Sequence, residues 1–420
     1  MRGREAQVPP PTDITIPGAG SHTARDILSQ SIRRLLADVR ALPATVAPNA
    51  AAREDLGTFT GVLSQLLRSP AGPGPGALFT VLRRPNVGGL VRCLRTAAAP
   101  DGDPVQCERL FTELVATTFL ELAWIGSLPQ TVRLQRLPAQ VVMLGARLRW
   151  RPQNGLRNVS ISNAGVDVDD PSEARRISFD ALRSQDRVLP VGVDRAFHAL
   201  VGNAVLALAD NNPLAMLEAH PDKFGNAIDL GDRPVTEWQT SLNDCLTRIE
   251  QYLPDVRREI DLYVQQFVPV GFDTEKHLSA SYQEAIGTIY LTLHPHPMTM
   301  TEAVIHEFSH NKINALFELD DLLINAFQPL YKSPVRPDPR PLHGVLLAVH
   351  AFLPVALLYE RMKAADDPLS RHAEFDRRFD AIRALNHEGA TTVLTHAQPT
   401  PVGRSVLDEI ARWDSYFARR

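Results

Sequence analysis

Hydrophobic positions recur every three or four residues in two long stretches of the N-terminal part of the chain. In residues 24–42 the apolar side chains form one stripe, and residues 111–128 repeat the pattern with more apolar positions. This period predicts amphipathic helices, and the glycine- and proline-rich residues 69–77 predict a linker between them. We therefore expect a helical N-terminal region at residues 21–130, preceded by a disordered arm at residues 1–20, which is rich in proline, glycine and polar residues.

The pattern changes after residue 130. Apolar and polar residues alternate within residues 131–190, between proline and glycine turns, which predicts short strands. An exposed edge of these strands is a candidate for binding an extended peptide. Helical spacing returns in residues 193–210 and 239–268.

The C-terminal third begins with a predicted strand at residues 287–293. A turn and a helix from about Met300 follow it, and a second helix starts at Pro341, since proline suits the first helical position. Residues 191–420 are thus expected to form a helical region that carries the chemistry. The fold class expected for the whole chain is α+β, mostly α-helical with a minor sheet, in which the two helices pack together.

Composition narrows the function classes. The chain has 420 residues, 44 Lys and Arg against 48 Asp and Glu, and a net charge of −4, which argues against a nucleic-acid partner. We see no stretch that approaches the ~20 apolar residues of a membrane span and no apolar signal segment at the N-terminus. The three cysteines form no CxxC pair. These features favour a cytoplasmic protein without a membrane partner.

One motif carries chemistry, and it lies inside the predicted helix after the strand. His306 and His310 are four residues apart, with Glu307 between them. Residues at this spacing share a helix face, so both imidazoles can reach one metal ion. The apolar flanking residues predict a buried helix, in which two histidines need a strong partner to offset their desolvation.

A catalytic metal needs a third protein ligand. Counting along an antiparallel helix pair places His350 level with His306 and His310, and we expect the helix to kink there because Pro354 follows one turn later. His343 and Glu360 are the alternatives, and a capping or supporting role suits His343 better. An HxD sequence at residues 220–222 is a weaker metal candidate, since no eight-strand barrel pattern surrounds it.

The segments GTIYLTL, TEAVIHEFSHNKINALFEL and SPVRPDPRPLHGVLLAVHAFLPVALLY resemble the HExxH-type peptide-modifying proteins of bacterial gene clusters for ribosomally made, modified peptides. Members are described as α-ketoglutarate-dependent peptide β-hydroxylases. The resemblance implies Fe(II) held by His306, His310 and His350, with 2-oxoglutarate and O2 as cosubstrates and a precursor peptide as substrate. An arginine usually binds the distal carboxylate of 2-oxoglutarate; Arg340 and Arg336 are the candidates, and Glu307 would support the site or contact substrate.

Two other hypotheses remain open. In a zinc metallopeptidase, Glu307 would act as the general base on a metal-bound water, and three histidines suit zinc equally well. In a metal-stabilised binding module, the same residues would hold an ion without turnover.

Overall fold

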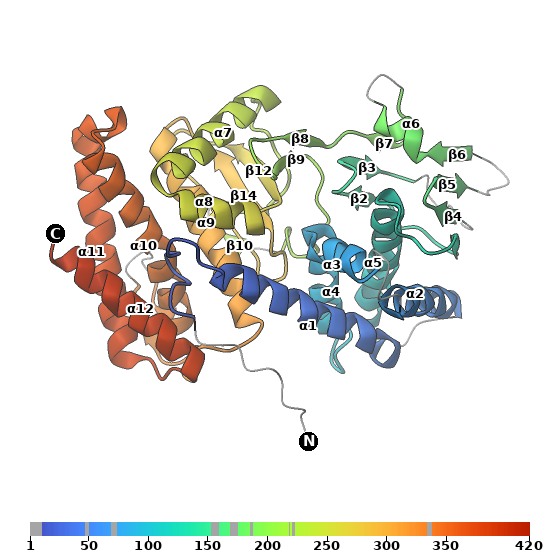
Figure 1. The fold of residues 1–420 in the computed structure, drawn as a ribbon, viewed down its shortest axis with the longest axis horizontal. Coiled ribbons are helices and arrows are strands. Elements are labelled where there is room, and N and C mark those ends of the chain that lie inside the picture. Colours follow the sequence, from blue (N-terminus) through green and yellow to red (C-terminus); the bar gives the residue numbers. More distant parts are fainter. Residues whose placement is uncertain are drawn as a thin grey trace.

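The protein is mostly helical, with several small sheets (Figure 1). The computed structural model describes residues 11–46, 50–68, 74–152, 159–168, 175–184, 188–217, 219–220, 223–333 and 338–420. Within these described residues it is 55% helical, with 12 α-helices, and none of its sheets closes into a barrel. The predicted fold class, a mostly helical α+β fold, is therefore confirmed.

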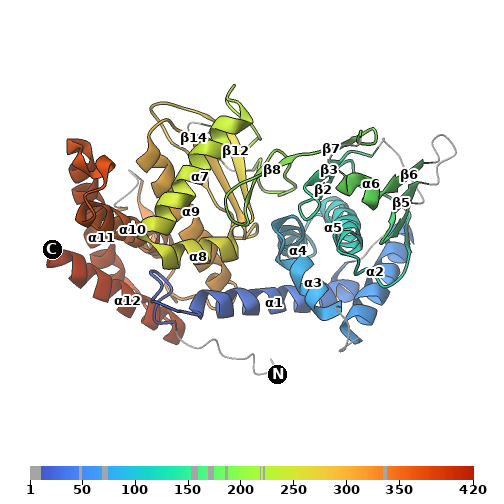
Figure 2. The same ribbon diagram turned by 45° about the horizontal axis from the view of Figure 1, so that its top comes forward.

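Five helices form the N-terminal part. They are α1 (Thr23–Thr45), α2 (Ala50–Arg68), α3 (Gly74–Arg83), α4 (Pro85–Ala97) and α5 (Pro104–Trp124). The apolar stripe predicted for α1 is buried at Ile27, Leu28, Ile32, Leu35 and Val39. Helix α1 runs along one side of the molecule and bridges its two halves (Figure 2).

The region expected to be β-rich contains two small sheets and a short helix. One sheet has the order β1-β4-β5-β6 and the other β2-β3-β7, and every neighbouring pair is antiparallel. Both views place these strands at the opposite end of the molecule from the C-terminal helices. The elements are β1 (Val132–Leu134), β2 (Val141–Met143), β3 (Leu148–Trp150), β4 (Val159–Ser162), β5 (Gly165–Val168), β6 (Arg175–Ser178), α6 (Phe179–Arg183) and β7 (Val193–Asp194).

A five-stranded mixed sheet, of order β13-β14-β12-β9-β8, supports the HExxH helix. Its strands are β8 (Phe197–Ala199), β9 (Val205–Ala207), β12 (Gln266–Phe272), β13 (Ser279–Ala280) and β14 (Thr288–Leu293), and β10 (Ala219–His220) pairs with β11 (Lys223–Phe224) elsewhere. β14 is parallel to β12, whereas the edge strand β13 is antiparallel to β14. Helices α7 (Val235–Tyr252) and α8 (Pro254–Tyr263) precede β12.

The helix predicted at residues 193–210 is wrong, because these residues form β7, β8 and β9. β8 and β9 are antiparallel neighbours, and Gly202 between them has φ +88°. Glycine adopts this backbone conformation at little cost, which allows the chain to reverse. The apolar spacing of this segment fits the helical period of about 3.6 residues as well as the strand period of two. The pairing of β8 with β9 makes the strand conformation the stable one.

The C-terminal part consists of α9 (Pro297–Phe317), β15 (Leu330–Tyr331), β16 (Arg340–Pro341), α10 (Leu342–Ala364), η1 (Pro368–Arg371), α11 (Ala373–His396) and α12 (Pro401–Ala418). α9 begins three residues before Met300, with Pro297 at its first position. Pro341 precedes α10 as its N-cap, and the helix continues through Pro354.

Helix α10 corrects one expectation from the sequence. It is long and apolar enough to cross a membrane, although we expected no such stretch, but most of it is buried inside the protein. Its neighbours α9 and α11 cover it. Helix α10 is therefore a core helix of this fold.

The prediction of a disordered arm at residues 1–20 is wrong for residues 11–20, which are ordered against the core. Residues 1–10 lie outside the described residues. Ile14 and Thr15 are at most 1% exposed and Ile16 is 6% exposed. The Glu409 carboxylate on α12 accepts hydrogen bonds from the backbone N–H groups of Thr15 and Ile16, each at 3.0 Å. Ile14 and Ile16 alternate with polar residues, so their burial outweighs the turn-forming composition around them.

Candidate metal site

Helix α9 presents a polar stripe of Glu302, His306 and His310, spaced four residues apart. The Nε2 atoms of the two histidines face each other at 2.8 Å. Two ligand atoms ~2.1 Å from one ion at right angles would lie about 3 Å apart, so the pair fits two adjacent positions around a metal. The Nδ1 atoms of both histidines are buried and have no hydrogen-bond partner among the described residues.

Both imidazoles are held in the neutral form that binds metals. Burial lowers the pKa of His306 well below its usual range, and the nearby His310, His350 and Arg378 lower it further. Burial also lowers the pKa of His310, against the opposing charge of Glu307. The ring of Phe352 lies 4.7 Å from the ring of His306 and covers one side of it.

Glu307 joins the two histidines in a group whose potential ligand atoms all lie within 4.8 Å of one another. Its carboxylate is 3% exposed and is fixed by the edge strand. Ser279 donates a hydrogen bond to Oε1 and Ser281 to Oε2, both at 2.7 Å. Asn311, one turn further along α9, donates to the Ser281 hydroxyl and to the Glu307 carbonyl. The carboxylate is therefore held in one orientation, against the sheet.

Helices α9 and α10 pack antiparallel in the predicted register. As the residue number rises along α9, the residue number of its partner on α10 falls. The contacting pairs are Glu302–Tyr359, Ser309–His350 and Phe317–His343. The prediction that His350 lies level with the HExxH motif is confirmed.

The structure does not bring the ring nitrogens of His350 into the cluster of possible ligand atoms. His350 is completely buried, with Nε2 3.2 Å from the Ser309 carbonyl and Nδ1 3.1 Å from the Thr15 hydroxyl. Burial, followed by the charge of Lys312, lowers its pKa well below the usual range. His350 is thus a neutral imidazole beside the cluster, and ligation by it stays a prediction.

The alternative third ligands, His343 and Glu360, are not part of the cluster of His306, Glu307 and His310, and each has partners of its own. His343 packs between Phe317 and Phe327, with ring centres 4.5 and 5.3 Å away. Burial lowers its pKa, and His310 adds to the effect. Glu360 accepts hydrogen bonds from Tyr416 and Arg420, both at 2.8 Å, so it serves the contact between α10 and α12.

Of the two arginines proposed from the sequence, only Arg340 lies in the described residues, and the partner that the structure gives it is an aspartate rather than a histidine. Arg336 lies outside the described residues, as does Asp222 of the HxD sequence. Arg340 forms an ion pair of 2.9 Å with Asp338. The arginine whose charge affects His306 is Arg378, from α11.

Sequence reasoning missed the side chains that support the motif from other elements. Arg378 donates to the Glu302 carboxylate through Nε and Nη2, at 3.1 and 2.6 Å to Oε2. The Tyr359 hydroxyl of α10 donates to Oε1 of the same carboxylate. The four-residue spacing from His306 marks Glu302 in the sequence, but no local signal marks the residues that bind it.

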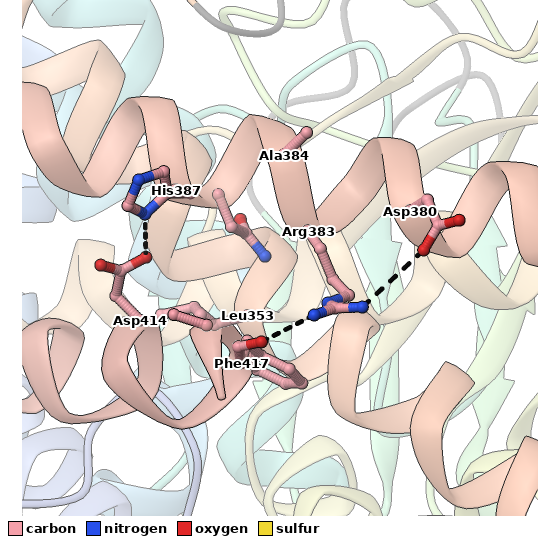
Figure 3. A pocket seen from close by; sticks show the side chains of 9 residues that line it. Leu353, Asp380, Arg383, Ala384, His387, Asp414 and Phe417 are labelled. Atoms are coloured by element: carbon pink, nitrogen blue, oxygen red, sulfur yellow. Dashed lines mark hydrogen bonds and ion pairs between the residues drawn. The ribbon is translucent and has the colours of Figure 1, made fainter. Parts of the chain in front are cut away.

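A separate pocket of about 240 Å³ lies between α10, α11 and α12 (Figure 3). Its charged groups bind one another: His387 lies 2.9 Å from Asp414, while Arg383 contacts Asp380 and donates to the Phe417 carbonyl at 2.7 Å. Its charged groups therefore offer no convergent set comparable to the histidine pair on α9.

No protein-family model matches the chain, and no curated protein matches it at a significant level.

Proposed function

We propose that this protein is an Fe(II)/2-oxoglutarate-dependent hydroxylase that modifies side-chain β-carbons of a ribosomally made precursor peptide. His306 and His310 would bind the metal through Nε2, with His350 as the third ligand. The resemblance of residues 280–365 to peptide β-hydroxylases supports the substrate class. The histidine pair, neutral and 2.8 Å apart, supports the metal.

The fixed carboxylate of Glu307 is the observation that favours a hydroxylase over a peptidase. A general base in a peptidase must take a proton from the attacking water. Here the hydroxyls of Ser279 and Ser281 hold both carboxylate oxygens toward the edge-strand segment, so the carboxylate is not free to turn to a metal-bound water. Such a carboxylate is suited to holding α9 against the sheet and to placing negative charge near His310.

Hydroxylation needs one oxygen atom of O2 inserted into a C–H bond and the other transferred to 2-oxoglutarate, which yields succinate and CO2. The bound iron and cosubstrate would supply that oxidising chemistry. The protein's own residues hold two imidazoles in the neutral form, cover one face of His306 with Phe352, and fix the third imidazole through Thr15. As a metal ligand, His350 would exchange its Nε2 contact with the Ser309 carbonyl for the metal and keep Nδ1 at the Thr15 hydroxyl.

The edge strand β13 is a better candidate for the peptide than the strands of residues 131–190. Ser279 of β13 and Ser281 directly after it contact Glu307, whereas the sheets of β1–β7 lie at the other end of the molecule. An extended peptide paired with β13 would add a strand beside the histidines. We place the protein in the cytoplasm, as its free and buried Cys93, Cys107 and Cys245 suit a reducing compartment.

A zinc metallopeptidase is the second candidate, because Glu307 lies within 4.8 Å of the potential histidine ligand atoms. Replacement of Glu307 by glutamine separates the two functions. In a hydroxylase, Glu307→Gln keeps metal binding and a measurable part of the 2-oxoglutarate turnover, since oxygen activation needs no base there. In a peptidase, the same variant keeps the metal and loses nearly all turnover.

The proposal is tested by following succinate formation from 2-oxoglutarate in iron-loaded protein under air. We expect iron-dependent succinate formation that His306→Ala abolishes. Iron-loaded protein that forms no succinate, together with zinc-loaded protein that cleaves peptides, would contradict the hydroxylase.

A further inference from the structure

We propose that Arg378 of α11 is the binding residue for the distal carboxylate of the 2-oxoglutarate cosubstrate, in place of the arginines suggested by the sequence. This inference rests on the proposed function. The observation behind it is a junction of three helices at Glu302, one turn before His306, where Arg378 and Tyr359 meet the same carboxylate.

The guanidinium of Arg378 is bound to Glu302, one helical turn before His306, and is partly open to solvent. Its positive charge lowers the pKa of His306. The side chain of Arg378 is 44% exposed, whereas that of Glu302 is 11% exposed. Lys312, the other cation beside this part of the site, is 1% exposed and is paired with Glu259 at 2.7 Å. Of these two cations, Arg378 is the one that an incoming ligand can reach.

The bond with Glu302 leaves part of the guanidinium for a second anion. Arg378 contacts Glu302 with Nε and Nη2. These two nitrogens form one edge of the planar guanidinium, and Nη1 and Nη2 form its outer edge. An arginine has five N–H donors in a planar fork, so its outer edge, with Nη1, can donate two parallel hydrogen bonds to another carboxylate. Glu302 and Tyr359 meanwhile hold the guanidinium in place.

The spacing along α9 fits the length of the cosubstrate. Four helical residues, about 6 Å along the axis, separate the Glu302 position from His306. The four carbon–carbon bonds of 2-oxoglutarate span about 5 Å when extended. A cosubstrate whose keto acid is bound at the histidines and whose chain extends along α9 toward its N-terminus would place its distal carboxylate at the height of the Glu302–Arg378 pair.

The test compares two keto acids that differ only at the distal end. 2-Oxopentanoate has the chain length of 2-oxoglutarate but ends in a methyl group. Binding of each to iron(II)-loaded protein is measured by calorimetry without oxygen, for the wild type, Arg378→Gln and Arg378→Lys. Arg383→Gln is the matched control, because this arginine of the same helix binds Asp380 and the Phe417 carbonyl instead (Figure 3).

We expect Arg378→Gln to weaken 2-oxoglutarate binding about 10- to 100-fold, as for the loss of a charge-assisted hydrogen-bonded pair, and to leave 2-oxopentanoate binding unchanged. Arg378→Lys keeps the charge beside Glu302 but not the planar fork, so it should lose part of the preference while the fold is retained. Unchanged 2-oxoglutarate affinity in Arg378→Gln, or equal loss for both keto acids, would overturn the assignment. Failure of the wild type to bind either keto acid would instead overturn the proposed function, and this inference with it.

Discussion

Replacing Glu409 by alanine should destabilise the protein, because this carboxylate holds the N-terminal segment in the core. Glu409 is 1% exposed and accepts hydrogen bonds from the N–H groups of Thr15 and Ile16 at 3.0 Å. In Glu409→Ala both N–H groups lose their partner inside the protein. Each buried unpaired donor costs about 1–3 kcal/mol, which suggests a loss of about 2–6 kcal/mol.

The lower half of that range is the better expectation. Burial raises the pKa of the Glu409 carboxyl, so the native state already bears a desolvation cost that the alanine variant relieves. We therefore expect the free energy of unfolding to fall by about 2–4 kcal/mol, a large part of a typical stability of roughly 5–15 kcal/mol.

Urea unfolding followed by circular dichroism measures the change in the free energy of unfolding. An unchanged slope of this free energy against urea concentration would show that the folded and unfolded states of the variant remain comparable with those of the wild type. Glu409→Gln is the matched control. It keeps one acceptor oxygen and should lose only about 1–2 kcal/mol. A loss below about 1 kcal/mol in Glu409→Ala would refute the reasoning, and residues 11–16 would then contribute little to the fold.

Three further predictions concern the metal ligands, pH and a buried ion pair. His350→Ala should lose bound metal and activity together, whereas His343→Ala should keep most of the metal, as metal analysis of the purified variants would show; the reverse result would exchange their roles. Burial raises the pKa of Glu113 to about 7, so the contribution of this carboxyl to stability is complete below about pH 4.3 and is lost as the pH rises through 7. Between pH 5 and 8.5 the free energy of unfolding of the wild type should therefore fall by up to about 3 kcal/mol more than that of Glu113→Gln. Identical pH profiles of the two proteins would contradict this. Arg92→Ala should cost about 3–5 kcal/mol in urea unfolding, because it leaves the buried carboxylate of Glu318 without its 2.5 Å partner; a loss below about 1 kcal/mol would count against the pair.

The sequence allowed the fold class and the helix pair to be predicted, because both depend on regular spacing. Counting residues along two antiparallel helices was enough to place His350 level with Ser309. The same counting could not give the direction of the ring nitrogens of His350, which depends on Thr15, 335 positions away in the chain. Contacts of this kind leave no local pattern.

Other features escaped prediction for related reasons. Ser279, Ser281 and Arg378 reach the motif from a strand, a loop and a helix that tertiary packing brings together. The composition of residues 11–20 is typical of a loop, yet Ile14 is fully buried, since a few apolar side chains suffice to hold a short segment against a large core. Residues 193–210 show the converse, a helical period in residues that form strands.

The central claim is that His306 and His310 bind an iron(II) ion that is chelated by 2-oxoglutarate. An anaerobic titration of the protein with iron(II) and 2-oxoglutarate, followed by visible absorption, tests it most directly. We predict one iron bound per chain and the weak metal-to-ligand charge-transfer band of a chelated keto acid, with both lost in His306→Ala. Tight stoichiometric zinc binding without any such band on adding iron(II) and 2-oxoglutarate would contradict the claim and favour the metallopeptidase.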